Sequence, residues 1–137
     1  MTCPDRFSQW SQEVSRAFPH LRKSQVRGLA LWSLGIALIG SEGIRQISAL
    51  LAVVLGEKEA TLFQRLREWY LDAQDKVGNH RRDLDIAECF GPLLQWIVRL
   101  HRGDKRLALA LDATTLRDQW IVLSVSVILL GCSIPVA

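Results

Sequence analysis

Cysteine is scarce in this 137-residue chain, which contains only Cys3, Cys89 and Cys132. The three are far apart and odd in number, so none has a neighbour at the short spacing that a zinc site or a redox motif requires. The first residues also lack the basic segment and apolar run of a secretory signal. We therefore expect reduced thiols in a cytoplasmic protein.

Low-complexity tracts, internal repeats and a strong charge imbalance are also missing. Hydrophobic residues make up 49% of the chain and charged residues 23%, values that exclude the disordered class and predict a core. The net charge of +3 permits an anionic partner without requiring one. The length suits one domain, or a small domain followed by the opening of a second.

Apolar residues recur at steps of three and four through residues 1–103, which predicts a helical module. Gly40 and Gly56 divide this pattern, and the polar residues 81–85 predict a loop. The expected helices cover residues 5–18, 24–39, 41–56, 57–76 and 86–101.

After Asp104 the pattern changes from helical to extended. Residues 107–112 form a short apolar run, and residues 120–130 form a second one rich in β-branched side chains. The polar residues 114–119 between them predict the connection of an antiparallel hairpin. The expected fold class is therefore α+β, with a helical module over 1–103 and a hairpin in 104–137.

The apolar residues 120–137 also permit a tail anchor in a membrane. Their β-branched residues, Ser124, Ser126, Gly131 and Pro135 favour a buried strand instead. We expect no membrane association, and a tail-anchored protein stays as an alternative.

Asp112 is the candidate for chemistry. A lone aspartate at the end of a strand is most often a turn or cap residue, although a carboxylate that projects from a strand end into a cleft is well placed for catalysis. Asp104 in the loop before the first strand and Asp118 in the hairpin connection suit solvated turn residues.

Residues 109–116, 120–124 and 131–137 together resemble the opening of the catalytic domain of insertion-sequence transposases of the DDE type. Residues 61–69 are similar to the N-terminal region of the same family. The resemblance implies an RNase H-like fold in which Asp112 is the first of three metal-binding acids. It also implies Mg²⁺ or Mn²⁺ as cofactor and phosphoryl transfer in DNA transposition.

The other two acids of that family come from a later strand and a later helix. Asp112 alone cannot hold two ions, so we expect an N-terminal transposase fragment that binds metal weakly and is inactive by itself. Its implied partners are double-stranded DNA at transposon ends, a second copy of the chain, or a full-length transposase.

The helices expected at 41–56 and 57–76 are compatible with a helix-turn-helix motif. Acidic residues share the second helix, so a helical bundle with a solvated charged face is the competing interpretation. A basic patch near the start of the chain is a second candidate for phosphate contacts. The candidate DNA-binding residues are Arg22, Lys23, Arg27, Lys58, Gln64, Arg65 and Arg67.

A small helical interaction or regulatory protein without catalysis is the main alternative function. It shares the helical module but predicts no salt-dependent binding to duplex DNA.

Overall fold

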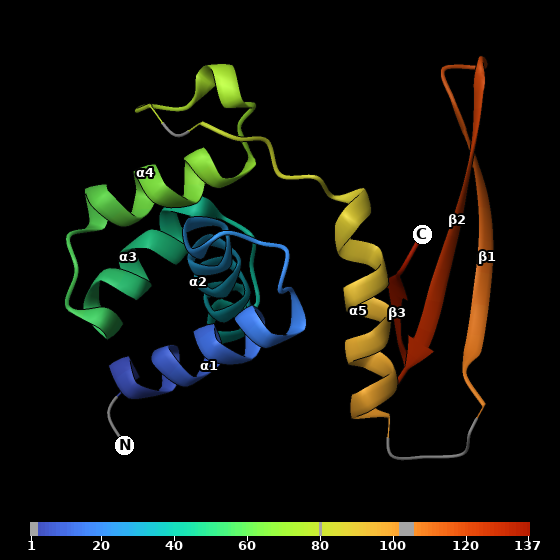
Figure 1. The fold of residues 1–137 in the computed structure, drawn as a ribbon, viewed down its shortest axis with the longest axis horizontal. Coiled ribbons are helices and arrows are strands. Elements are labelled where there is room, and N and C mark those ends of the chain that lie inside the picture. Colours follow the sequence, from blue (N-terminus) through green and yellow to red (C-terminus); the bar gives the residue numbers. More distant parts are fainter. Residues whose placement is uncertain (1–2, 80, 102–105) are drawn as a thin grey trace. The chain divides into compact units, whose positions relative to one another are not determined.

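The computed structural model describes residues 3–79, 81–101 and 106–137 (Figure 1). Helices come first in the chain and a three-stranded antiparallel sheet follows, which confirms the α+β class. The chain divides into two compact units, Met1–Leu84 and Asp85–Ala137. We describe each unit by itself.

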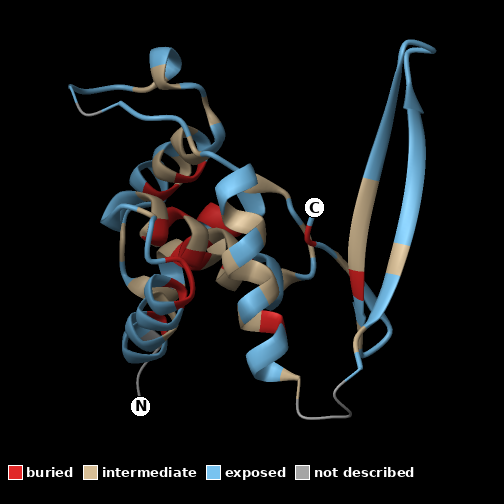
Figure 2. Cartoon of the chain, turned by 45° about the vertical axis from the view of Figure 1, so that its right-hand side comes forward, coloured by how far each residue is buried: buried red, intermediate tan, exposed pale blue. Residues whose placement is uncertain are grey.

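The first unit is a helical bundle around an aliphatic core. Its helices are α1 (Cys3–Ala17), α2 (Lys23–Ile39), α3 (Ile44–Leu55) and α4 (Glu59–Tyr70), followed by a 3-10 turn, η1 (Ala73–Asp75). Their inward positions follow the helical spacing of the sequence, and Figure 2 shows the buried residues gathered among these helices. The fully buried aliphatic side chains include Leu31, Ile47, Leu51, Leu62 and Leu66.

Gly40 and Gly56 end α2 and α3 in the left-handed conformation, with φ of 70° and 67°. Glycine adopts this conformation without the steric cost that a side chain brings. The amide of Gly40 also donates a hydrogen bond to the carbonyl of Ile36, 2.7 Å away, which closes the last turn. The two breaks therefore lie where the sequence predicted them.

The fourth helix is shorter than predicted. It ends at Tyr70 rather than near Lys76, because Leu71 has an extended backbone with φ of −73° and ψ of 152°. A carboxylate oxygen of Asp83 then accepts a hydrogen bond from the amide of Ala73 at 2.6 Å. This contact from later in the chain holds η1 as a separate turn.

Tryptophan side chains connect α2 to its neighbours through hydrogen bonds. The indole N–H of Trp69 donates to the carbonyl of Gln25 at 2.9 Å, and that of Trp32 donates to the carbonyl of Leu66 at 3.0 Å. Both bonds join α2 to α4. These half-buried indoles combine apolar packing with one satisfied donor.

The second unit contains α5 (Ala87–Leu100), β1 (Ala108–Leu116), β2 (Trp120–Leu129) and β3 (Cys132–Pro135). The strands pair in the order β1-β2-β3, and both pairs are antiparallel. Ile97 of α5 packs with Val127 and Val136, so α5 shares its core with the strands. The predicted helical module over 1–103 grouped this helix with the preceding ones, whereas α5 belongs to the same compact unit as the strands.

The hairpin differs from its prediction in two respects. β1 continues through residues expected in the connection, because Thr114 and Thr115 pair with Val122 and Ile121 of β2. The turn is therefore limited to residues 117–119, where Arg117 and Asp118 have φ of 50° and 55°.

A third strand was not predicted. Leu130 and Gly131 have φ of 50° and 80° and turn the chain, so that β3 returns along β2. The apolar run from β2 into Leu130 concealed this turn in the sequence.

Among the described residues, no single helix has the length and apolar composition needed to cross a membrane. Helices α2 and α3 meet that test only as a pair, with a bend of 96° between them.

Gly28 provides a test of the contact between α2 and α4. A Cβ atom at this position would lie 2.0 Å from Cδ1 of Trp69, on a ring that is already fixed by its hydrogen bond to Gln25. We predict that Gly28→Ala lowers the free energy of unfolding by about 2 kcal/mol, although alanine favours helices. Urea denaturation of the full chain measures this change.

Gly91→Ala in α5 is the matched control, because a Cβ there meets no atom of a non-adjacent residue within 4 Å. It should change the free energy of unfolding by less than Gly28→Ala does, because the helix propensity of alanine is opposed only by the local cost of a Cβ before Pro92. Equal destabilisation by the two substitutions would contradict the close contact at Gly28.

Candidate nucleic-acid interface

A basic pocket of about 280 Å³ lies in the first unit, between the start of α2, the end of α4 and the segment after η1. Five of its lining side chains are basic and one, Glu68, is acidic. The remaining lining residues include Ser24, Gln25, Trp69 and Val77. The basic ones are Arg22, Arg65, Lys76, Arg81 and Arg82.

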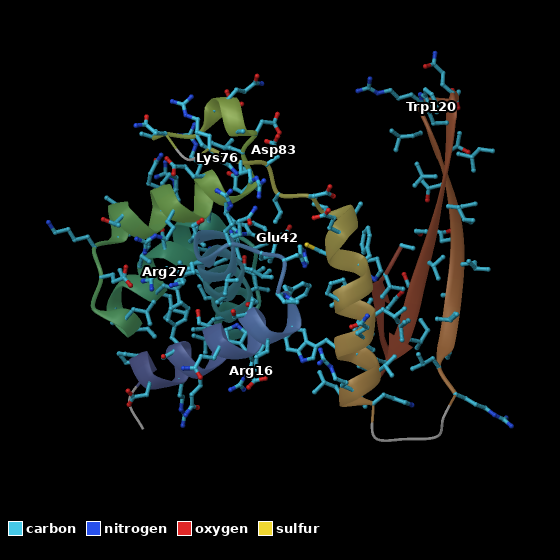
Figure 3. The ribbon with its side chains drawn as sticks, in the orientation of Figure 1. Arg16, Arg27, Glu42, Lys76, Asp83 and Trp120 are labelled. Carbon is cyan, nitrogen blue, oxygen red and sulfur yellow. The ribbon has the colours of Figure 1, made fainter. Side chains whose placement is uncertain are left out.

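The segment after η1 is held against the helices by hydrogen bonds. The side-chain amide of Gln25 donates to the carbonyl of Asp83 at 3.3 Å, which joins α2 to this segment. Lys76 donates to the carbonyl of Arg82, and Arg81 donates to the carbonyl of Gly78 at 2.7 Å. In Figure 3, Lys76 and Asp83 lie near each other beyond the end of α4.

Two arginines at this pocket, Arg22 and Arg82, have no neighbouring carboxylate among the described residues and can bind an anion. Lys76 and Arg81 are committed to carbonyls of their own segment. Arg22 and Arg82 are exposed, and neither forms an ion pair with a carboxylate of the described residues. An incoming anion therefore meets uncompensated positive charge at these two side chains.

Arg27 and Arg65, both predicted to contact DNA, share one internal carboxylate. Arg27 forms an ion pair with Glu57, and the guanidinium of Arg65 lies 3.2 Å from the other oxygen of the same side chain. The guanidinium of Arg27 also stacks over the ring of Phe7, 5.4 Å from its centroid. These contacts give both arginines a role in holding the bundle together, and Arg65 still lines the pocket.

The other candidate residues lie on exposed positions of the first unit. Lys23 begins α2 next to Arg22, and Lys58 immediately precedes α4. Gln64 donates a hydrogen bond to Glu68 at 2.6 Å, and Arg67 is exposed in the last turn of α4. Of the predicted set, only Arg22 and Arg65 meet at the pocket.

Sequence reasoning missed Lys76, Arg81 and Arg82, because residues 81–85 were interpreted only as a linker. The signal available in the sequence was the pair of adjacent arginines at 81 and 82, shortly after Lys76. The contact that brings this segment to Gln25 spans 58 residues and has no local signature.

Asp112 lies in the middle of β1, not at the end of a strand as predicted. It is exposed, its Cα partner in β2 is Ser124, and it accepts a hydrogen bond from the hydroxyl of Thr114 at 3.3 Å. Alternation along the strands places Asp112, Thr114, Ser124 and Ser126 on one face of the sheet. The same face also carries Leu116, Trp120, Val122 and Ile128, so the exposed carboxylate lies among hydroxyl side chains at the middle of a mixed face.

The opposite face of the sheet is apolar. It carries Leu109, Leu111, Leu123, Val125 and Val127, of which Val125 and Val127 pack in the core with α5. Leu111 and Leu123 are 71% and 63% exposed, and Figure 2 shows that the strands of the hairpin are exposed over most of their length.

The donor set around Asp112 does not fit a pair of divalent ions. The described residues contain no group of three or more His, Cys, Asp or Glu side chains that could hold one metal. Asp118 lies in the hairpin turn, and Asp104 is outside the described residues. Two-ion phosphoryl transfer needs several carboxylate ligands, and the described residues bring no such group together at Asp112.

Comparisons of the chain with protein-family models, with curated proteins and with solved structures give no match. The resemblance to transposases therefore rests on the residues quoted above.

Glu57 tests whether Arg27 and Arg65 act mainly inside the bundle. We predict that Glu57→Gln lowers the free energy of unfolding by about 1 kcal/mol, because one carboxylate neutralises two arginines there, and that added salt reduces this difference. Thermal or urea denaturation at two salt concentrations measures it. Glu13→Gln is the control, since its pair with Arg16 is a surface pair whose side chains are 51% and 70% exposed, and it should have little effect.

Asp112 leads to a prediction about catalysis. The purified chain should show no Mg²⁺-dependent cleavage or joining of DNA strands, because the described residues place no group of carboxylates around Asp112 that could hold two ions. A gel assay with labelled duplex measures this. Strand transfer by the chain that disappears in Asp112→Ala would contradict the prediction.

Proposed function

We propose that the chain is the N-terminal, DNA-binding part of an insertion-sequence transposase of the DDE type, and that it acts in the cytosol on duplex DNA at transposon ends. One observation carries the proposal. Asp112 lies at the centre of the first strand of a three-stranded antiparallel sheet. An aspartate on the first strand, followed by a strand pair, is the arrangement that the resemblance implies for an RNase H-like catalytic domain.

The two units have different roles in this proposal. The first unit binds the DNA backbone through the exposed basic residues at the start of α2 and around the pocket. The second unit contributes the first acid of a catalytic domain. Phosphoryl transfer with Mg²⁺ or Mn²⁺ would belong to an assembly that supplies the remaining carboxylates.

An interaction protein without catalysis is the second candidate. The apolar face of the sheet favours it, because Leu111 and Ile121 are 71% and 79% exposed. Contiguous exposed apolar side chains are typical of surfaces that contact another protein. Binding to duplex DNA distinguishes the two functions.

Duplex binding is measured by the fluorescence anisotropy of a labelled DNA at salt concentrations from about 50 to about 200 mM. We predict that the Kd rises steeply with salt, because each phosphate contact releases counterions. The double variant Arg22→Gln, Lys23→Gln should bind more weakly to every duplex sequence and should reduce the salt slope by about 2.

The matched control removes two positive charges from α1, at Arg6 and Arg16. Both are exposed, and Figure 3 shows Arg16 on the side of the helical unit away from Lys76. Arg6→Gln, Arg16→Gln should retain most of the affinity. Binding that is insensitive to salt, or an equal loss in both double variants, would overturn the proposed interface.

A further inference from the structure

The pocket between α2 and α4 has a positively charged side and an apolar side. Arg22 and Arg82 provide positive charge, and Trp69 and Val77 provide apolar surface. We propose that this pocket binds a nucleoside phosphate, with the phosphate at the arginines and the base against Trp69. The inference rests on the proposed DNA-binding function in one respect: that function makes an unpaired nucleotide at a DNA strand end the source of the ligand.

The cationic side of the pocket suits a phosphate group. Guanidinium groups bind phosphate oxygens through paired, charge-assisted hydrogen bonds, and neither Arg22 nor Arg82 has a carboxylate partner among the described residues. Glu68, the one acid in the lining, already accepts a hydrogen bond from Gln64. Arg22 also lies at the N-terminal end of α2, where the helix dipole favours negative charge.

The apolar side suits a base. Trp69 is fixed in orientation by its hydrogen bond to Gln25 and by its close packing on Gly28, so its ring does not need to be ordered when a ligand binds. Stacking on an aromatic ring is the common means of holding an unpaired base. Val77 extends this surface and is 77% exposed.

The size of the pocket favours a nucleotide over a simple ion. Its volume of about 280 Å³ far exceeds the space of roughly 15 Å³ that a single water needs. Inorganic phosphate would contact the arginines and leave the surface of Trp69 and Val77 uncovered. A nucleotide of a continuous duplex is stacked on its neighbours and cannot present its base, so the ligand is a free or an unpaired nucleotide.

The first experiment follows the indole N–H of Trp69 in the full-length chain by ¹H–¹⁵N NMR, with Trp69→Phe used to identify its signal. Deoxyadenosine monophosphate should shift this signal at concentrations where inorganic phosphate does not. Arg82→Gln should weaken the nucleotide about tenfold, because it removes a charge-assisted hydrogen bond. Arg6→Gln, at an exposed arginine of α1 outside the pocket lining, should leave the affinity unchanged.

The second experiment identifies the source of the nucleotide. Anisotropy compares a blunt duplex with the same duplex carrying a short single-stranded overhang. We expect tighter binding to the overhang, and Arg82→Gln should remove that preference while the blunt duplex still binds. A shift with the monophosphate but no preference for the overhang would support the free nucleotide as the ligand.

Two results would overturn the inference: no shift of the Trp69 signal with the monophosphate, or an equal shift with inorganic phosphate. Salt-dependent binding to the blunt duplex would persist in either case if the proposed function is correct. The two proposals therefore fail separately.

Discussion

The contact between Trp69 and α2 is the interaction on which the helical unit depends. The indole ring packs on Gly28 with no room for a side chain, and its N–H satisfies the carbonyl of Gln25. This contact fixes the distance between α2 and α4 and so determines the shape of the pocket between them. The side chain of Gln25 also donates a hydrogen bond to the carbonyl of Asp83 and so holds the segment that carries Arg81 and Arg82. Gln25 therefore links the packing of α4 on α2 to the basic surface.

Local patterns predicted much of the fold. The apolar spacing and the breaks at Gly40 and Gly56 placed α2 and α3 correctly, because both signals act within a few residues. The end of α4 could not be predicted from the apolar pattern, since the helical spacing continues through Ala73 although the backbone becomes extended at Leu71 and the amide of Ala73 bonds to Asp83 instead. Thr114 and Thr115 were assigned to a loop because they are polar, although pairing with β2 extends the strand through them.

The sequence predicted that the site between α2 and α4 is basic, but not which residues come together there. Arg22 and Arg65 were found as basic residues, and they meet at the pocket. The ion pair between Glu57 and Arg27 could not be predicted from the sequence, because the two residues are 30 positions apart. This pair neutralises part of the positive charge that the composition suggested. Asp112 was singled out correctly as a strand residue, but only the register of β1 with β2 shows that it lies in the middle of the strand, opposite Ser124.

β1 has a neighbouring strand along only one of its edges in the described part of the chain. An open edge of this kind is a template on which a further strand can form, and it carries a risk of aggregation. Asp112 lies at the middle of that edge strand. If β1 strands of two chains paired antiparallel about this position, the two carboxylates would face each other at a Cα separation of about 5 Å, and their repulsion would oppose the pairing. A charge at the centre of this edge strand therefore disfavours that one register of edge-to-edge pairing.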